Sequence, residues 1–242
     1  MANAKPRLKL IDPNAGEPPN QSTSMADRIV DSITGAIVER RLMPGTKLVE
    51  QQLADLFEVS RTLVRQALNR LSRNRLVSLH PRRGAFVTEP SPEEARQVFA
   101  VRELLELQLV RQLCAKRRPE HLAQLRRHLA REAKALRQGD VAGRTRLLAD
   151  FHVLLAQLAG NQVLAEILSD LLARCSLIAL MYQSTHSAQA SAAEHGELVD
   201  AIQAGDARRA VRLMAEHLGH VEAGLQAAAA PRSLAQALGV AA

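Results

Sequence analysis

Aromatic side chains are scarce in this chain. Of its 242 residues one is Tyr, four are Phe and none is Trp, while 47% of the sequence is hydrophobic. A core of this kind has to be built from Leu, Ala and Val, which favours helices. The length allows one large domain or two ordinary ones. The composition therefore predicts a mainly α-helical protein.

Cysteines and long apolar runs are also few. The two cysteines, Cys114 and Cys175, stand in apolar, helical contexts and are too few to form a disulfide framework. No run of 18 apolar residues occurs, which argues against a transmembrane helix, and the N-terminus has no apolar signal core. These absences predict a cytoplasmic protein without a membrane partner.

Acidic residues are absent from residues 60–88, which contain seven arginines. The whole chain has a formal net charge of +7, and residues 1–89 hold most of that excess, with 14 Lys/Arg against 9 Asp/Glu. A basic segment of this kind favours an anionic partner such as nucleic acid. An arginine-rich helix face that stands alone is more often only a solvated surface, so its neighbours decide between the two interpretations.

Two short helical segments surround the start of this basic region. Their apolar faces are marked by Leu53, Leu56, Val59, Val64, Leu68 and Leu71. The break between them is only a few residues long, and Ser60 is a good N-cap for the second segment. Arg61, Thr62 and Arg65 then lie in its first turns, and the two arginines share the face opposite the apolar one. This pattern predicts a helix-turn-helix whose second helix enters the major groove of DNA.

A β-hairpin is predicted directly after the second helix. Residues 76–80 and 85–88 have the composition of short strands, and Pro81-Arg82-Arg83-Gly84 forms the turn between them. A hairpin beside a helix-turn-helix is a wing. Arg82 and Arg83 at its tip are expected to enter the minor groove or to hold the DNA backbone.

These segments together carry a resemblance to a known family. The matching motifs are Leu48-x-Glu50-x-x-Leu53-Ala54, Val59-Ser60-Arg61-Thr62-x-x-Arg65-x-Ala67-Leu68-x-x-Leu71 and Pro81-x-x-Gly84-Ala85-x-Val87. They resemble the winged-helix domain of GntR-family bacterial transcription regulators. The resemblance implies that Arg61, Thr62 and Arg65 contact DNA and that Gly84 lies at the wing tip. That family often has a basic residue where Gln51, also a candidate DNA contact, stands here, and usually a glycine at the position of Arg75.

The remainder of the chain is predicted to form an antiparallel helical bundle. Residues 1–23 are expected to be a flexible tail, 24–88 the winged helix with a first helix from Met25 to about Arg41, 89–92 a linker, 93–230 the bundle and 231–242 a second tail. The bundle helices are expected near 92–117, 119–138, 140–159, 161–184, 188–204 and 206–229. Glycines at positions 139, 160 and 205 mark three of the breaks, and short connections favour antiparallel neighbours.

Three histidines of the bundle, His152, His195 and His217, lie on three different predicted helices. Imidazoles that meet in a bundle core can bind a divalent metal and leave positions open for water or a ligand. A single histidine on a helix is more often a satisfied core or surface residue. We prefer that interpretation for His121, His128 and His186, and His220 is a weaker alternative ligand.

A second resemblance covers this part of the chain. Arg102-x-x-x-Glu106, Phe151-His152-x-x-Leu155 with Gly160-Asn161 after it, and an Ala-Ile-x-x-Gly-Asp segment between His195 and His217 resemble the FCD ligand-binding domain of FadR-type GntR regulators. Metal-bearing members of that family use one Asp and three His, which implies His152, His195 and His217 as the metal ligands. Leu148 replaces the Asp here. Asp150 lies about 200° round the helix from His152 and should point away.

The replacement leaves two alternatives. Either three histidines hold Zn²⁺ or Ni²⁺ more weakly, with solvent or an effector carboxylate completing the site, or they bind an anionic effector without metal. Arg102 is the candidate partner for an effector carboxylate, and a salt bridge to Glu106 is the alternative role for it. Tyr182 either hydrogen-bonds a ligand or packs in the core.

The sequence thus predicts a ligand-responsive transcription regulator that binds a palindromic operator as a homodimer. The resemblance implies a repressor that a small organic acid releases from DNA. A metal-dependent enzyme is disfavoured because the chain has no His-Glu-x-x-His motif, no histidine with a Glu three residues before it and no glycine-rich phosphate loop. A DNA-binding protein without ligand would not require a large second domain.

Overall fold

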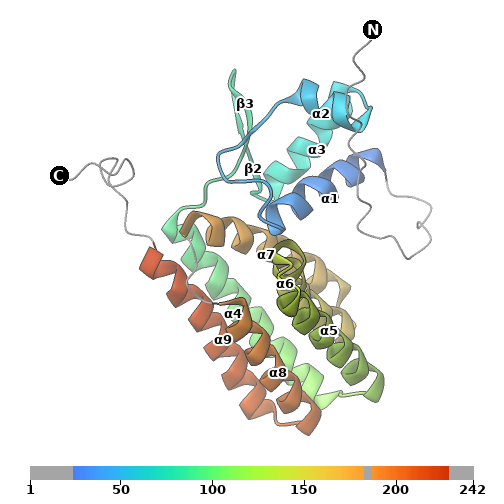
Figure 1. Ribbon diagram of the computed structural model, residues 1–242, viewed down its shortest axis with the longest axis vertical. Helices are drawn as coiled ribbons and strands as arrows, with labels where there is room; N and C mark the ends of the chain where they lie inside the picture. Colours follow the sequence, from blue (N-terminus) through green and yellow to red (C-terminus); the bar gives the residue numbers. More distant parts are fainter. Residues whose placement is uncertain (1–23, 183–186, 229–242) are drawn as a thin grey trace, which may run out of the picture.

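A computed structural model describes residues 24–182 and 187–228. A small head stands on a bundle of long helices (Figure 1). The head contains α1 (Met25–Val38), β1 (Lys47–Leu48), α2 (Glu50–Phe57), α3 (Arg61–Arg73), β2 (Val77–His80) and β3 (Gly84–Val87). The bundle contains α4 (Pro92–Ala115), α5 (Pro119–Arg137), α6 (Val141–Leu158), α7 (Gln162–Tyr182), α8 (Ala188–Ala204) and α9 (Ala207–Ala228). The mainly helical fold with a winged helix-turn-helix, expected from the sequence, is confirmed.

The head is a three-helix unit with a small sheet. Ser24 and Asp27 form a capping box that starts α1, whose apolar face is buried against α3. α2 ends at Glu58, which adopts a left-handed backbone with φ of +55°. α3 starts at once, because the Ser60 side chain accepts a hydrogen bond from the backbone N–H of Leu63 at 3.3 Å. The tight turn of the helix-turn-helix follows from these two caps.

The sheet has the order β1-β3-β2 and both of its pairings are antiparallel. β2 and β3 form the expected hairpin. β1 was not expected, because a two-residue strand has no readable alternation and its partner, β3, lies far along the chain. The first helix also ends at Val38 and not near Arg41, since Arg40 turns into the left-handed region with φ of +58°.

The bundle helices begin and end within two residues of their expected positions. Side-chain caps from Ser91, Asp140 and Ser187 fix the starts of α4, α6 and α8. Gly139, Gly160 and Gly205 follow helix ends with φ of +66°, +76° and +73°. Of the helices described by the structure, none is long and apolar enough to cross a membrane.

Helix α7 belongs to both hydrophobic cores. Most of its apolar residues, including Leu168 and Ile178, pack in the core of the bundle. Ala173 and Leu177 are instead buried in the core of the head, together with Ile33 and Ile37 of α1. A hydrogen bond also joins the head to α7, because Asn74 Nδ2 donates to Asp170 Oδ1 at 2.9 Å. The head is therefore seated on α7 through packed side chains as well as through the covalent linker.

Candidate functional site

The outer face of α3 carries the predicted DNA-contacting residues. Its opposite face buries Val64 and Leu68, which orients the helix and leaves Arg61, Thr62 and Arg65 exposed. The side chains of the two arginines are 59% and 61% exposed. The sequence prediction of an apolar face opposite a basic one is thus matched by the structure.

Both arginines are held by an acid that sequence reasoning did not single out. Glu50, the first residue of α2, accepts from Arg65 Nε at 3.0 Å and from Arg65 Nη2 at 2.8 Å. Arg61 Nη2 lies 3.4 Å from the same carboxylate. Gln51 beside it is exposed and donates to Asp55 at 2.8 Å. The LxExxLA motif contained Glu50, but its partners could only be identified once α2 and α3 were packed together.

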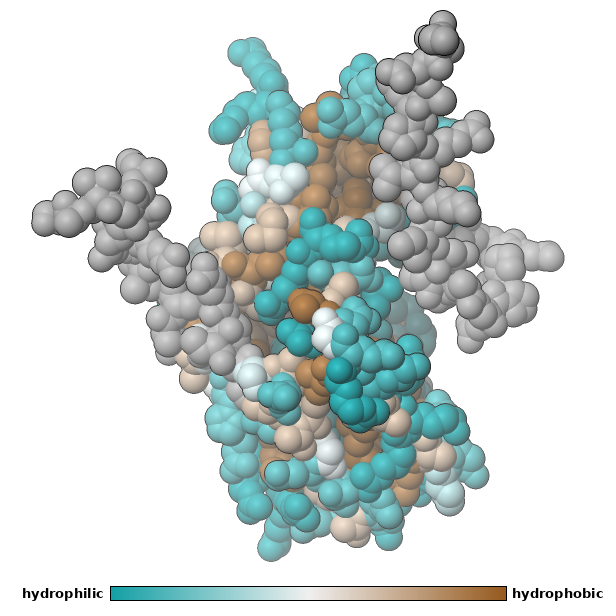
Figure 2. Space-filling view, viewed as in Figure 1, coloured by the Kyte–Doolittle hydropathy of each residue, from teal (hydrophilic) through white to brown (hydrophobic). Residues whose placement is uncertain are grey.

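The wing projects from the head and has a hydrophilic tip (Figure 2). Gly84 takes φ of +96° and Arg82 takes φ of +63°, which closes the tight turn. The Arg83 guanidinium lies over the Phe86 ring at 5.6 Å. Arg75 adopts φ of +59°, which explains why the related domain usually has glycine at this position. Both wing arginines are exposed to a partner.

In the bundle, α6, α8 and α9 bring His152, His195 and His217 together. Their side chains are almost completely buried, and their candidate ligand nitrogens all lie within 4.8 Å of one another. The ring centroids are 4.9 to 5.3 Å apart. We call these three residues the histidine cluster. This geometry agrees with the prediction that three separate helices bring these rings to one place.

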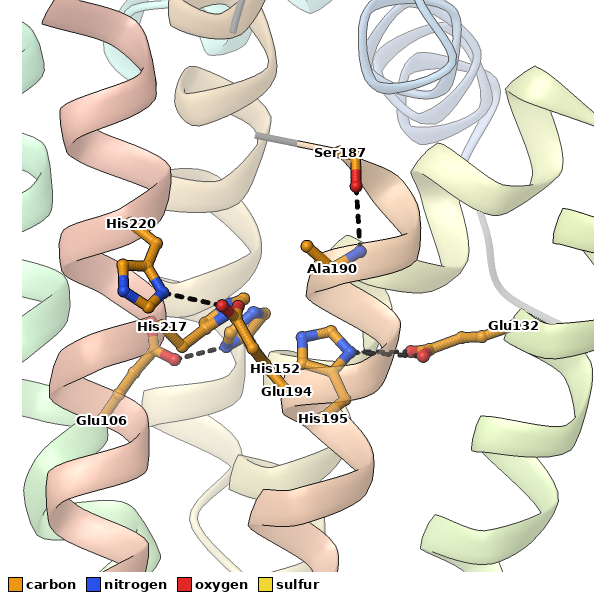
Figure 3. Close-up of polar contacts among 9 residues, drawn as sticks. All are labelled: Glu106, Glu132, His152, Ser187, Ala190, Glu194, His195, His217 and His220. Atoms are coloured by element: carbon orange, nitrogen blue, oxygen red, sulfur yellow. Dashed lines mark hydrogen bonds and ion pairs between the residues drawn. The ribbon is translucent and has the colours of Figure 1, made fainter. Parts of the chain in front are cut away.

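A different glutamate holds each ring of the cluster (Figure 3). His152 Nδ1 lies 2.5 Å from Glu106, and His195 Nδ1 lies 3.1 Å from Glu132. His217 Nδ1 lies 2.6 Å from Glu194, whose other oxygen accepts from His220 at 2.7 Å. Histidines that bind metal usually donate their second ring N–H to a carboxylate, which fixes the ring and makes it a better ligand. The residues present therefore fit a divalent metal.

Burial controls the charge of the cluster. It lowers the pKa of His152 and His217 to about 4 and also lowers that of His195, against the opposing effect of the glutamates. Burial alone would raise the pKa of Glu106, but the charge of Arg102 and the contact with His152 lower it below its usual range. Near neutral pH the imidazoles are thus uncharged, which is the state that binds a metal ion.

Arg102 lies beside the histidine cluster and is 3% exposed. Its Nε donates to Glu106 at 2.7 Å, so the salt bridge weighed from the sequence does form. Nη1 lies 3.6 Å from the Cys175 sulfur on α7. Nη2 of Arg102 and Nε2 of His195 are both buried, and neither has a hydrogen-bond partner in the structure. An unpartnered guanidinium N–H in a buried place is costly unless a ligand accepts from it.

The other predicted positions fall outside the cluster. Asp150 is exposed and lines a cavity of about 220 Å³ between α1, α6 and α7, so it points away from His152 as expected. His128 is buried and satisfied by the Leu147 carbonyl and by Glu132. The side chain of Tyr182 lies outside the described residues, as does His186. Glu132 was missed because nothing in its local sequence distinguishes it from a surface glutamate.

Comparisons with known proteins agree with both halves of this description. The family model for bacterial regulatory proteins of the gntR family matches residues 25–87, and the model for the FCD domain matches residues 97–220. The HTH-type transcriptional repressor RspR of Escherichia coli K12 is 26% identical over 186 residues, which cover 76% of this chain and 82% of that protein.

A Streptomyces ambofaciens HTH-type transcriptional regulator is 30% identical over 185 residues, covering 75% of this chain and 77% of the relative. The crystal structure of a GntR regulator from Rhodococcus sp. RHA1 aligns with a TM-score of 0.75 and 25% identity, over 85% of this chain and 99% of that one. These proteins are transcription regulators and not enzymes. The chain belongs to the GntR family of bacterial regulatory proteins, as a DNA-binding transcription regulator whose bundle is an FCD domain.

Proposed function

We propose that this regulator is a homodimeric repressor of the FadR type whose DNA binding is controlled by a small carboxylate and a divalent metal in the histidine cluster. The observation that carries the proposal is the buried cluster itself, with three imidazoles held by three glutamates and an arginine beside them. A buried set of this kind is expensive to assemble without a ligand to bind. The repressor role is supported by its E. coli relative, which is named a repressor.

His152, His195 and His217 would hold the metal, Zn²⁺ or Ni²⁺ by their donor type. Leu148, which stands at the position of the usual fourth ligand, cannot coordinate, so a coordination position remains for the effector. A bound cation attracts a carboxylate, and Arg102 adds a second positive charge close by. The effector class we propose is therefore a small organic acid that contacts the metal with one group and Arg102 with another.

The bundle also provides a surface for dimerisation. Val101 and Leu104 are exposed on α4, and Leu104 retains 76% of its accessible area. An exposed apolar stripe on a long helix favours a second copy packed against it. Two heads related by a two-fold axis would require an operator with two-fold symmetry. In each head, Arg61, Thr62 and Arg65 would read bases in the major groove, while Gln51, Arg82, Arg83 and the Gly84 turn contact the DNA near them.

Helix α7 offers a path from the effector to the head. Arg102 contacts Cys175 on one face of this helix. Ala173 and Leu177, two residues before and after Cys175, lie on the opposite face and are buried in the core of the head. An effector that accepts from Arg102 would change the contact between Arg102 and Cys175. Because α7 packs in both cores, a small shift of this helix would reposition the head relative to its partner's.

Metal analysis tests the cluster directly. Elemental analysis of the purified protein should find about one divalent ion per chain, and His152→Ala should lose it. His121→Ala, outside the cluster, should keep it. Absence of metal from the wild-type protein, even after incubation with Zn²⁺ or Ni²⁺, would refute the metal and leave direct binding of an anion by the cluster.

The effector and the operator are tested together. An operator is first selected by the protein from random DNA duplexes, and the proposal expects a two-fold symmetric sequence. A panel of small carboxylates is then screened for release of this DNA by fluorescence anisotropy. Arg102→Lys should weaken the response to an active carboxylate at least tenfold. If DNA release is unchanged in this variant, Arg102 does not bind the effector.

A further inference from the structure

Glu50 and Arg65 form a fork-shaped ion pair on the DNA-facing side of the head. The carboxylate accepts from Nε and from Nη2 of Arg65, at 3.0 and 2.8 Å. Both side chains remain partly accessible, at 27% for Glu50 and 61% for Arg65. Within the described parts of the chain, no other carboxylate lies within ion-pair distance of Arg61 or Arg65. Among the residues that the structure describes, Glu50 is thus the one acid that pairs with Arg61 and Arg65.

The geometry determines which side of Arg65 is occupied. A guanidinium has five N–H donors, and Glu50 takes those on the edge formed by Nε and Nη2. The edge formed by Nη1 and Nη2 keeps two parallel donors. In the major groove, a guanine presents two acceptors, O6 and N7, which can receive two parallel hydrogen bonds from this edge. The pair therefore leaves Arg65 with the edge that reads a guanine.

An exposed ion pair contributes little to protein stability, so stability is a weak reason for Glu50 to be here. Its effect on the conformation of Arg65 is larger. An unpaired arginine samples many rotamers and can contact any nearby phosphate, whereas a fork holds the guanidinium in one plane. The hydrogen bonds from Arg65 also lower the pKa of Glu50, so the carboxylate stays charged to a lower pH than an unpaired glutamate does.

We propose that Glu50 is a positioning residue for base recognition, which holds Arg65 ready for a guanine and keeps it away from the phosphates of other sequences. The inference rests on the proposed contact of Arg65 with DNA. Its consequence is specificity: Glu50 strengthens binding to the operator but does not strengthen binding to unrelated DNA. An acidic residue inside a basic interface thereby acquires a role in DNA recognition.

The test compares Glu50→Gln with Asp55→Asn. Both variants remove one negative charge from α2, but Asp55 is paired with Gln51 and not with an arginine. Dissociation constants are measured for the selected operator and for a scrambled duplex of equal length, over a series of salt concentrations. Thermal unfolding of each variant checks that it is folded. Selection from random duplexes is repeated with each variant.

For Glu50→Gln we expect about tenfold weaker operator binding and a relaxed base preference at one position of each half-site. On scrambled DNA, the binding constant should fall more steeply with salt concentration, by the slope of about one additional phosphate contact. Asp55→Asn should show none of these three changes. If the two variants behave alike on both duplexes, Glu50 acts only through its charge and the proposal is wrong.

Arg65→Ala separates this inference from the proposed function. If Arg65→Ala binds the operator as the wild type does, Arg65 does not contact a base and both the contact and the inference fall. If Arg65→Ala loses the operator while Glu50→Gln is unchanged, the contact stands and only the role of Glu50 is refuted. In the double variant Glu50→Gln with Arg65→Ala, the loss of specificity should equal that of Arg65→Ala alone.

Discussion

Replacement of Arg102 by methionine should destabilise the protein strongly. Arg102 and Glu106 are 3% and 0% exposed and are joined by a 2.7 Å hydrogen bond. Methionine fills much of the same volume, so little packing is lost. The variant nevertheless leaves the Glu106 carboxylate buried with only His152 as partner. Breaking a buried ion pair from one side costs about 3–5 kcal/mol, because the remaining charge is uncompensated.

Thermal unfolding followed by circular dichroism measures this loss. For a chain of this length, a loss of about 4 kcal/mol lowers the melting temperature by about 10 °C. Arg111→Met is the matched control, because Arg111 lies on the same helix and is exposed. A surface substitution of this kind should change the free energy of unfolding by at most about 0.5 kcal/mol.

A second substitution tests the electrostatic explanation. Adding Glu106→Gln to Arg102→Met removes the uncompensated charge, so the double variant should recover at least about 1 kcal/mol relative to the single variant. A single variant within about 1 kcal/mol of the wild type would refute the reasoning. So would a double variant that is less stable than the single one, since this would mean that the loss came from packing.

Four further changes have defined outcomes. Arg75→Gly should raise the free energy of unfolding by about 1 kcal/mol in urea, because glycine adopts the left-handed backbone without a Cβ clash; a lower midpoint would contradict this. Glu194→Gln should weaken divalent-metal binding about 10–100-fold in competition with a chelating dye, and unchanged affinity would exclude an orienting role. The metal-free protein should lose stability as the pH falls from about 6.5 to about 4, because His152 and His217 take up protons in the unfolded chain but not when buried. The loss in the free energy of unfolding should reach about 3 kcal/mol per ring, and denaturant midpoints that do not change with pH would refute the burial argument. Leu104→Arg should halve the molar mass in light scattering, and an unchanged dimer would place the interface elsewhere.

The secondary structure was largely predictable because the local signals were strong. Ser60 caps α3 where the sequence placed it, and the expected glycines follow helix ends with positive φ angles. Errors appeared where a distant partner decides the outcome. β1 exists only because β3 pairs with it, and this pairing cannot be read from two residues. Arg75 was recognised as unusual, and its left-handed backbone supplied the reason.

The meeting of the three histidines was predictable from the sequence, but the glutamates that hold them were not. The three histidines were singled out because they lie on three different predicted helices and match the histidine positions of the FCD domain that this part of the chain resembles. Glu132 was missed because its partner His195 lies 63 residues away, on a helix that only tertiary packing brings to α5. The same holds for Glu50 and Arg65, which are 15 residues apart on different helices. Pairs at helical spacing, such as Arg102 and Glu106, were accessible from sequence alone.

Helix α7 packs in the cores of both the head and the bundle, and this limits how easily the two parts can be separated or exchanged. Cutting the chain at the linker before Pro92 would uncover Ala173 and Leu177 on the bundle and the apolar surface of α1 on the head. Recombination that joins a head to a foreign bundle would succeed only if the incoming α7 offered a matching surface. Head and bundle are therefore expected to be inherited together, and a hybrid regulator for laboratory use should carry the α1 and α7 surfaces from one parent.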